Sequence, residues 1–267
     1  MSVITKKQGQ LEYLTAEGIT APHCFTTRLG GVSQGYLSSL NIGLHRGDDP
    51  KNVEKNFGIL ADALGITPDD FVLTKQIHSD IVVKVGRADR GKYMMEGASP
   101  ECDALITNEP DVALVVFTAD CTPILFHDPV TGAVGAAHAG WRGTAMGIAA
   151  KTVEAMVREY GCDAKNIRAA IGPNIGSCCF ETDRDVPDAM VAALGEAAKP
   201  FIRPKNDKYY VNLKEINALW IRRAGVEQIE ISDACTVCQS DRFWSHRVTR
   251  GQRGSQGAII VCKEAVR

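Results

Sequence analysis

A succession of short apolar segments separated by turns constrains the fold of this chain more than any other feature. Alternating or continuous apolar patterns of this length predict β-strands. The turn sequence Asp-Pro-Val-Thr-Gly at residues 128–132 predicts that the strands on either side of it form a hairpin. The predicted strands are residues 23–28, 71–79, 81–85, 103–107, 112–118, 123–127, 133–138, 167–171, 209–212, 229–233 and 258–263.

Helices are predicted between and after these strands. Residues 50–64 follow the N-cap residue Asp49, begin with a proline, and are closed by Gly65. Residues 144–160 repeat apolar side chains on one helical face and precede Gly161, a C-cap signal. Two further helices are predicted at residues 186–198 and 213–224. Strands interspersed with helices, without a repeat or a polar linker, predict an α+β fold with mixed β-sheets, flanking helices and a single compact domain over residues 1–267.

Composition excludes several classes of partner. The 30 Lys and Arg residues are scattered and nearly balanced by 32 Asp and Glu residues, whereas nucleic-acid binding usually needs a clustered basic surface. No segment approaches the roughly 20 apolar residues that span a membrane, and the first ten residues lack a signal-peptide pattern. We therefore expect a cytoplasmic protein, a monomer or weak homodimer, with no nucleic-acid or membrane partner.

The nine cysteines are an odd number, which excludes complete internal pairing. In a reducing compartment such residues are reduced thiols, metal ligands or nucleophiles. Cys235 and Cys238 form a C-x-x-C pair without a second such pair, and Cys178 and Cys179 are adjacent, a spacing that rarely ligates one ion. We interpret both pairs as pocket-lining or redox-sensitive thiols, with structural packing slightly favoured.

Asp120 and Cys121 lie at a break between two predicted buried strands. A carboxylate at such a place needs a partner, because leaving it unpaired in a core costs several kcal/mol. Asp120 is therefore a catalytic candidate, as is the Cys121 thiol. The alternative is a capping aspartate beside a buried cysteine.

The segment Ala136–Gly143 places one imidazole, one indole and one guanidinium among small residues. His138 ends a predicted strand, and Arg142 stands just before a predicted helix N-terminus, which favours anions. Gly140 and Gly143 would let the backbone approach a ligand closely. The alternative is a tight strand-to-helix turn with a stacked Trp–Arg pair.

The segment Lys75–Asp80 predicts an alternating strand in which Gln76, His78 and Asp80 share one face. A polar face on an otherwise buried strand suggests the wall of a pocket. Taken alone, His78 is more often a hydrogen-bonded structural histidine than a metal ligand.

Together, His78, Cys121 and His138 make a donor set suited to zinc, with copper as the alternative metal. Three protein ligands leave a fourth position open, as in catalytic rather than structural sites. We predict that all three lie within bonding distance of one point.

In the N-terminal third, Arg28 precedes two glycines and a polar loop that includes Asn41, which could bind an anion or form a glycine hairpin.

The sequence contains, in order, the motifs TTRLGGVSQG, SLNIGLH, GDDP, KQIHSD, CDALIT, FTADCTPILFHDP, AAHAGWRG, IGPNIGSCCFE and CTVCQSDRFWSHR. In these motifs the chain resembles the laccase-domain family, also called polyphenol-oxidase-like or peptidoglycan editing factor, over about residues 20–262. That resemblance implies a metal held by His78, Cys121 and His138. Two departures are visible: Asn174 stands where many members have Cys, and His246 stands where Tyr is common.

The resemblance further implies phosphorolysis of adenosine, inosine or methylthioadenosine to base and ribose 1-phosphate, with adenosine deamination to inosine. Asp120 is then the candidate proton carrier, and Arg28 and Arg142 are the candidate phosphate clamp, with Gln76 and Asn41 as further substrate contacts.

Alternatives stay open: a metal-independent Cys/His hydrolase, a cell-wall-precursor editing amidase, a copper polyphenol oxidase and a non-catalytic binding module. The six histidines of the chain argue against a four-copper oxidase.

Overall fold

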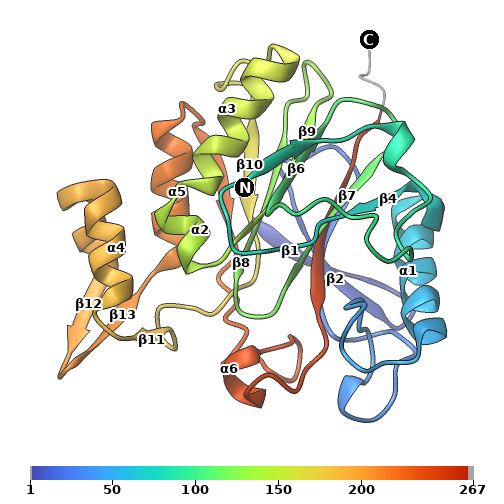
Figure 1. The fold of residues 1–267 in the computed structure, drawn as a ribbon, viewed down its shortest axis with the longest axis horizontal. Coiled ribbons are helices and arrows are strands. Elements are labelled where there is room, and N and C mark those ends of the chain that lie inside the picture. Colours follow the sequence, from blue (N-terminus) through green and yellow to red (C-terminus); the bar gives the residue numbers. More distant parts are fainter. Residues whose placement is uncertain (1, 264–267) are drawn as a thin grey trace.

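Two mixed β-sheets lie face to face at the centre of residues 2–263, the part of the chain that this computed structural model describes (Figure 1). Met1 and residues 264–267, which the predicted domain includes, lie outside the described residues. Within the described part, the first six-stranded sheet has the order β1 (Val3–Gln8), β2 (Leu11–Ala16), β3 (His23–Thr26), β15 (Gln256–Val261), β7 (Ala113–Thr118) and β4 (Phe71–Leu73). The second has the order β14 (Gln228–Ile231), β10 (Arg168–Ile171), β8 (Thr122–His127), β9 (Val134–Ala139), β6 (Ala104–Thr107) and β5 (Val82–Lys84).

Both sheets are mixed, as predicted. The pairs β4·β7, β5·β6 and β10·β14 are parallel, and the remaining neighbours in both sheets are antiparallel. The predicted hairpin is confirmed, because β8 and β9 pair antiparallel from Thr122↔Ala139 to His127↔Val134. The α+β fold class with mixed sheets and flanking helices is therefore correct.

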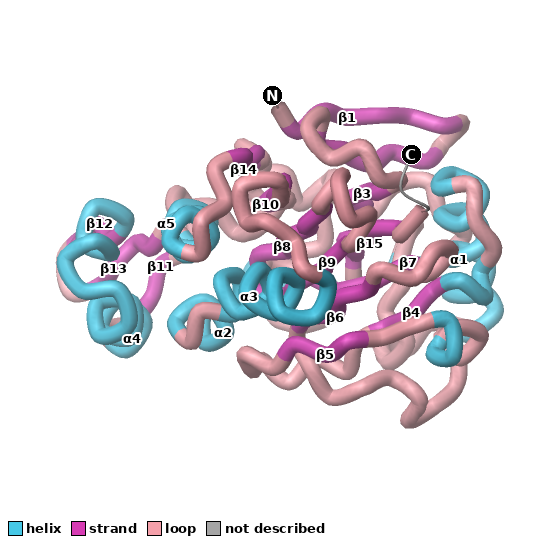
Figure 2. The backbone as a smooth tube through the Cα atoms, turned by 90° about the horizontal axis from the view of Figure 1, so that it is seen from above, coloured by secondary structure: helices cyan, strands magenta, loops and turns pink. Residues whose placement is uncertain are grey.

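Helices cover the outer faces of both sheets (Figure 2). α1 (Pro50–Leu64) packs Phe57 and Leu60 against the first sheet, and its predicted caps Asp49 and Gly65 are present. α3 (Ile148–Tyr160) and α5 (Leu213–Arg223) cover the second sheet. A further apolar core fills the space between the two sheets. The chain therefore has four layers, in the order helix, sheet, sheet and helix.

The predicted helix 144–160 is wrong as a single element. It is two helices, α2 (Trp141–Ala145) and α3, separated at Gly147, which adopts a left-handed φ of 78°. The Trp220 indole packs against Gly147 and donates a hydrogen bond to the Thr144 carbonyl oxygen at 2.8 Å. The apolar pattern continues through this break, so the pattern alone did not reveal it.

A smaller three-stranded sheet, with the order β11 (Glu181–Thr182), β13 (Lys208–Val211) and β12 (Ile202–Lys205), projects at one end with α4 (Asp185–Leu194) (Figure 1). The predicted helix 186–198 ends early because Gly195 has a positive φ and a 3-10 turn, η4 (Gly195–Phe201), follows it. The remaining short elements are η1 (Gly35–Leu37), η2 (Pro68–Asp70), η3 (Arg87–Asp89) and α6 (His246–Thr249). Within residues 2–263, no helix is both long enough and apolar enough to cross a membrane.

Candidate metal centre

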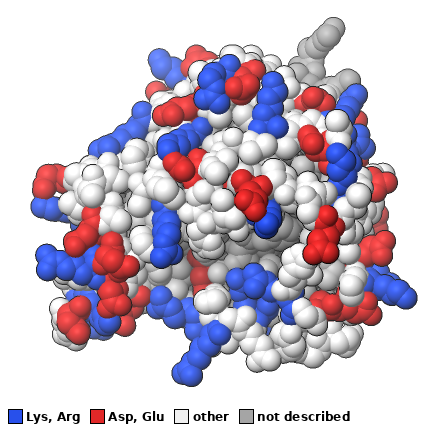
Figure 3. All heavy atoms as spheres, viewed as in Figure 1, with Lys and Arg blue, Asp and Glu red and all other residues white. Residues whose placement is uncertain are grey.

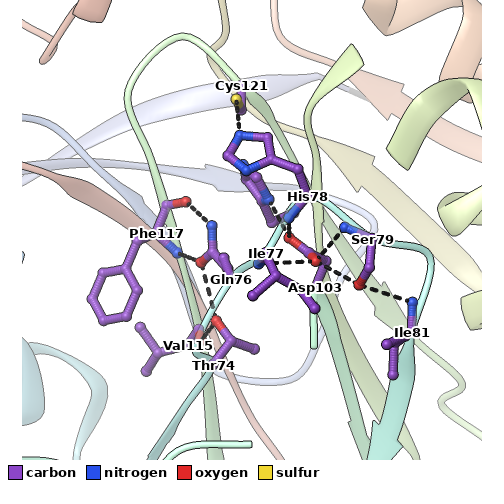
Figure 4. Close-up of polar contacts among 11 residues, drawn as sticks. Thr74, Gln76, Ile77, His78, Ser79, Ile81, Asp103, Val115, Phe117 and Cys121 are labelled. Carbon is purple, nitrogen blue, oxygen red and sulfur yellow. Dashed lines mark hydrogen bonds and ion pairs between the residues drawn. The ribbon is translucent and has the colours of Figure 1, made fainter. Parts of the chain in front are cut away.

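His78, Cys121 and His138 converge on one point from three different segments. His78 lies in the loop between β4 and β5, Cys121 lies between β7 and β8, and His138 lies within β9. Their potential ligand atoms all lie within 4.8 Å of one another, and Cys121 Sγ is 4.0 Å from His78 Nε2 (Figure 4). The two imidazole rings stand edge to face with their centroids 4.9 Å apart. We call these three residues the triad centre.

The loop that carries His78 is shaped by a carboxylate that the sequence analysis did not single out. Asp103 accepts hydrogen bonds from three successive backbone amides, those of Ile77, His78 and Ser79, at 3.2, 3.1 and 2.6 Å (Figure 4). It also accepts one from the Ser79 hydroxyl at 2.7 Å. His78 consequently adopts a φ of 60°, outside the range of a strand.

The predicted strand 71–79 is therefore wrong beyond Leu73, where β4 ends. Gln76, His78 and Asp80 do not share a strand face, because the chain wraps around the Asp103 carboxylate instead. Alternation of polar and apolar residues is also found in such a loop, and the sequence pattern does not distinguish the two.

Asp103 also orients the second histidine of the triad centre. His138 is 2% exposed, and its Nδ1 lies 2.8 Å from an Asp103 carboxylate oxygen. A carboxylate that receives one ring nitrogen fixes the imidazole and leaves the other nitrogen for a metal. The sequence does carry a signal for Asp103, because it is an acidic residue at the start of a predicted buried strand and therefore needs a polar partner, as Asp120 does.

The charges at the triad centre reinforce one another. Burial alone would raise the pKa of the Cys121 thiol, but His138 and His78 lower it to about 6. Burial would lower the pKa of His138, but Cys121 and Asp103 raise it to about 9. Burial would raise the pKa of Asp103, but hydrogen bonds from His138 and Ser79 lower it to about 2. The centre therefore favours a thiolate donor, the form that binds metals.

Two glycines let the elements of the centre approach closely. A Cβ atom on Gly140 would lie 2.8 Å from His78 Cδ2 and 3.5 Å from Cys121 Sγ. A Cβ atom on Gly143 would lie 2.9 Å from the Ser79 carbonyl oxygen. The close approach that we expected for a ligand at these glycines is made by the chain's own His78 loop.

Asp120 points away from the triad centre. Its carboxylate accepts hydrogen bonds from the Thr236 hydroxyl at 2.6 Å, the Ser245 hydroxyl at 3.1 Å and the Arg247 backbone amide at 2.7 Å. Asp120 is 8% exposed and has a φ of 80°, so it turns the chain into Cys121 while binding the C-terminal segment. These contacts make the carboxylate a structural tie to the C-terminal segment, and its role as a proton carrier stays a prediction.

Gln76 and Asn41 are also committed to the fold. The Gln76 amide exchanges hydrogen bonds with the Phe117 backbone N–H and C=O at 2.6 and 2.8 Å. Asn41 is fully buried, accepts from the Gly43 and Ser255 amides at 2.9 Å, and donates to Asp48 at 2.8 Å. Both side chains shape loops beside the centre: Asn41 is fully buried, whereas Gln76 lines a cavity, so their predicted roles as substrate contacts stay predictions.

The two predicted clamp arginines differ in their surroundings. Arg28 stacks on the Trp244 ring at 3.9 Å and donates to the carbonyl oxygens of Ser38 and Ser240. Arg142 is exposed, and its guanidinium stacks on Trp141 at 4.3 Å without a side-chain hydrogen bond to the described residues. Arg142 therefore keeps its donors available for an anion, whereas Arg28 supports the loop around it.

A third arginine, which the sequence analysis missed, lies near the triad centre. The Arg253 side chain donates to Ser255 and to the Gly254 carbonyl, while its buried Nε has no partner among the described residues. Burial and then Arg46 lower the pKa of Arg253 to about 10, and the charges of Cys121 and Asp120 oppose this shift. Figure 3 shows Lys and Arg side chains beside a hollow on the face of the molecule that Figure 1 views.

A cavity of about 580 Å³ adjoins the His78 loop. Lys75 and Gln76 line one wall, Arg46 and Ser255 line another, and Phe117 adds an aromatic ring. Its volume lies within the usual range for small-molecule sites, about 300–1,000 Å³. The triad residues do not line the cavity, which reaches the His78 loop at Lys75 and Gln76.

The cysteines that were interpreted as two separate pairs lie together. The Sγ atoms of Cys178, Cys179, Cys235 and Cys238 are all within 4.8 Å of one another. The two pairs are thus one group, although the sequence contains no second C-x-x-C pair, because the fold brings the C-x-x-C turn against the adjacent pair. We call these residues the four-cysteine cluster.

The fold and the triad centre define an α+β protein with a His/Cys/His centre that could hold a metal ion. The chain belongs to the family described as multi-copper polyphenol oxidoreductase laccase, whose family model matches residues 22–263. The resemblance that the sequence motifs indicated is thereby confirmed.

Curated relatives and solved structures agree with this assignment. The purine nucleoside phosphorylase YlmD of Geobacillus stearothermophilus is 40% identical over 244 residues, which cover 90% of this chain and 89% of the relative. The human purine nucleoside phosphorylase LACC1 is 34% identical over 251 residues, 91% of this chain and 56% of the relative. The crystal structure of YlmD from G. stearothermophilus matches with a TM-score of 0.92 and 37% identity, covering 98% of this chain and 100% of that one.

Proposed function

We propose that this chain is a zinc-dependent purine nucleoside phosphorylase. It cleaves adenosine, inosine or methylthioadenosine with phosphate to the free base and ribose 1-phosphate, and it deaminates adenosine to inosine as a companion activity. The observation that carries the proposal is the His78, Cys121 and His138 centre in a chain 40% identical to a relative named as a purine nucleoside phosphorylase.

The donor set fits zinc. Tetrahedral coordination with Zn–S and Zn–N bonds of about 2.3 and 2.1 Å places a sulfur and a nitrogen donor about 3.6 Å apart, close to the 4.0 Å between Cys121 Sγ and His78 Nε2. Asp103 supplies the carboxylate that commonly orients a zinc-binding histidine. When bound, zinc supplies Lewis-acid assistance to attack on the substrate, and three protein ligands leave one coordination position for that purpose.

The residues around the centre divide the work of binding. Arg142 and Arg253 keep donors available for an anion, and the planar guanidinium group suits phosphate. Arg28 holds the neighbouring loop and reaches phosphate only if it exchanges a carbonyl contact. The cavity beside Gln76 offers Phe117 as an apolar surface for a purine. Phosphate and nucleoside are thus the proposed small-molecule partners.

Copper oxidation of phenols is not the proposed activity, despite the family's description. Two histidines and a cysteine are also a copper donor set. Among residues 2–263, groups of three or more potential metal ligands occur at the triad centre and the four-cysteine cluster, and the cluster contains no histidine. The histidine-rich second copper cluster that a laccase uses to reduce oxygen is therefore missing from the described part of the chain.

The same geometry supports a second candidate, a metal-independent Cys/His hydrolase. Cys121 would be the nucleophile and His138 the base, with Asp103 orienting the imidazole at 2.8 Å. A cell-wall precursor would be a plausible amide substrate for this chemistry.

The deciding experiment follows adenosine and inosine by chromatography, with and without phosphate, in wild type, zinc-depleted protein and Cys121→Ser. Phosphate-dependent release of adenine and hypoxanthine that returns with zinc supports the phosphorylase. Full activity in metal-free protein would favour the hydrolase. Release of alanine or serine from a cell-wall precursor, with nucleosides untouched, would reverse the substrate assignment.

A further inference from the structure

We propose that the four-cysteine cluster is a second metal site, in which Cys178, Cys179, Cys235 and Cys238 hold one structural zinc ion in a closed tetrathiolate. This site is separate from the triad centre, and the proposal does not depend on the reaction proposed above.

The sulfur positions fit a tetrahedral ion. Cys238 Sγ lies 3.6 Å from Cys178 Sγ and 3.4 Å from Cys179 Sγ, and all four sulfur atoms lie within 4.8 Å of one another. Four thiolates at about 2.3 Å from zinc stand about 3.8 Å apart. The observed spacings therefore need only small side-chain adjustments to surround one ion.

Neither disulfide bonding nor packing explains this grouping. The sulfur–sulfur distances are far longer than the roughly 2.05 Å of a disulfide, and all four residues are free thiols. Within the cluster Cys178 and Cys238 are exposed, Cys179 is half-buried and Cys235 is buried, whereas the free cysteines outside the two groups are all buried: Cys24, Cys102, Cys162 and Cys262. Exposed thiols gain little from apolar burial, so their convergence at the surface requires another reason.

The backbone prepares the cluster for thiolates. The Gly176 amide donates to Cys235 Sγ at 3.2 Å, a bond that stabilises negative charge on sulfur. A Cβ atom on Gly176 would stand 3.2 Å from both Cys178 Sγ and Cys235 Cβ, so glycine permits the close approach of the two loops. A turn closed by the Cys179 amide and the Gly176 carbonyl at 2.9 Å directs the two adjacent sulfur atoms toward Cys238.

The position of the cluster suggests what the ion does. The cluster joins the loop after β10 to the turn after β14. Asn174 forms an isolated β-bridge with Cys235, and its carbonyl oxygen accepts a hydrogen bond from the Thr236 amide at 2.9 Å. The Thr236 hydroxyl in turn binds Asp120, the residue before Cys121. A bound zinc would thus stabilise the turn whose Thr236 contacts Asp120, next to the triad residue Cys121. It would also fix the segment that leads into β11 of the three-stranded sheet.

The test is zinc content by elemental analysis of protein purified under reducing conditions. We expect two zinc ions per chain in wild type and in Ser177→Ala, a control in the same loop that removes no thiol. Cys238→Ser and Cys121→Ser should each lose one. X-ray absorption of Cys121→Ser should show four sulfur ligands around the zinc that remains.

Several results would overturn the proposal. One is a single zinc ion in wild type that Cys238→Ser retains, and another is histidine nitrogen around the zinc left in Cys121→Ser. A third is a disulfide among the four cysteines, detected in wild type by thiol alkylation and intact mass. If Cys238→Ser fails to fold, the absorption spectrum of Cys121→Ser and the wild-type thiol count still decide the question.

Discussion

The triad centre and the four-cysteine cluster are both groups of metal-binding side chains, but they are built differently. The triad draws its donors from three segments far apart in sequence and rests on the buried carboxylate of Asp103. The cluster draws four sulfur donors from two short loops and rests on backbone amides. Three protein ligands, oriented by a carboxylate, leave one coordination position of a metal free for a reactant. Four thiolates fill the coordination of a tetrahedral ion, which suits a structural role.

This difference makes the two groups experimentally separable. Damage to the triad should remove activity and leave most of the stability, because the surrounding strands are packed on both faces. Damage to the cluster should lower stability first, because a bound ion would cross-link the loop after β10 to the turn after β14. The predictions below test that separation, and the largest effect comes first.

The largest effect is expected for His138→Ala. A catalytic metal lowers the activation free energy by several kcal/mol, so its loss should reduce the rate of phosphorolysis about 1,000-fold. The variant should lose one zinc ion and keep the other. Cys238→Ser is the paired comparison, with activity reduced no more than about tenfold. Unchanged activity in His138→Ala would remove the triad from the reaction.

Asp103→Asn should have the next largest effect. An amide cannot accept from three backbone amides and an imidazole as a carboxylate does, so the His78 loop and His138 should lose their fixed orientation. Zinc affinity at the triad should fall about 10–100-fold, the usual range for such supporting residues. Competition with a chromogenic chelator measures this, and an affinity equal to wild type would show that Asp103 only stabilises the fold.

Asp120→Asn should mainly affect stability. Its carboxylate accepts three hydrogen bonds from the C-terminal segment, and weakening them should cost about 2 kcal/mol in the free energy of unfolding. For a chain of this size, that corresponds to a fall of about 4–8 °C in Tm. We expect kcat to change less than tenfold. A 100-fold loss of kcat at unchanged Tm would instead support Asp120 as a proton carrier.

Much of the fold could be predicted because hydrophobic patterning acts locally. Apart from the predicted strand 71–79, the strands around the centre and α1 were predicted to within a few residues, since their patterns and caps are complete in the sequence. β1 was missed because Val3–Gln8 is polar and largely exposed, whereas β2 was missed although Leu11–Ala16 is largely buried. The break at Gly147 depends on Trp220, more than 70 residues away, so no local pattern could reveal it.

At the site, donor types could be predicted and their partners could not. His78, Cys121 and His138 were selected for their chemistry and the family motifs, and they converge. Whether Asp103 or Asp120 faces the centre depends on backbone turns with positive φ at His78 and Asp120. The four-cysteine cluster was missed because pairs spaced by more than 50 residues meet only through the crossing of two loops.

The smallest effect should come from Gly140→Ala, which tests how tightly the triad is packed. The added Cβ would lie 2.8 Å from His78 Cδ2 and 3.5 Å from Cys121 Sγ, too close for the histidine to keep its place. Because the His78 loop is held by Asp103, the ring should tilt rather than leave, and zinc affinity should fall about tenfold, or about 1.4 kcal/mol. Gly58→Ala is the matched control: it lies within α1, its added Cβ meets nothing within 4 Å, and it should leave zinc affinity unchanged while stabilising the helix by about 0.5–1 kcal/mol. Equal zinc affinity in both variants would mean that the His78 loop moves freely, and the triad would then be a looser site than the carboxylate support implies.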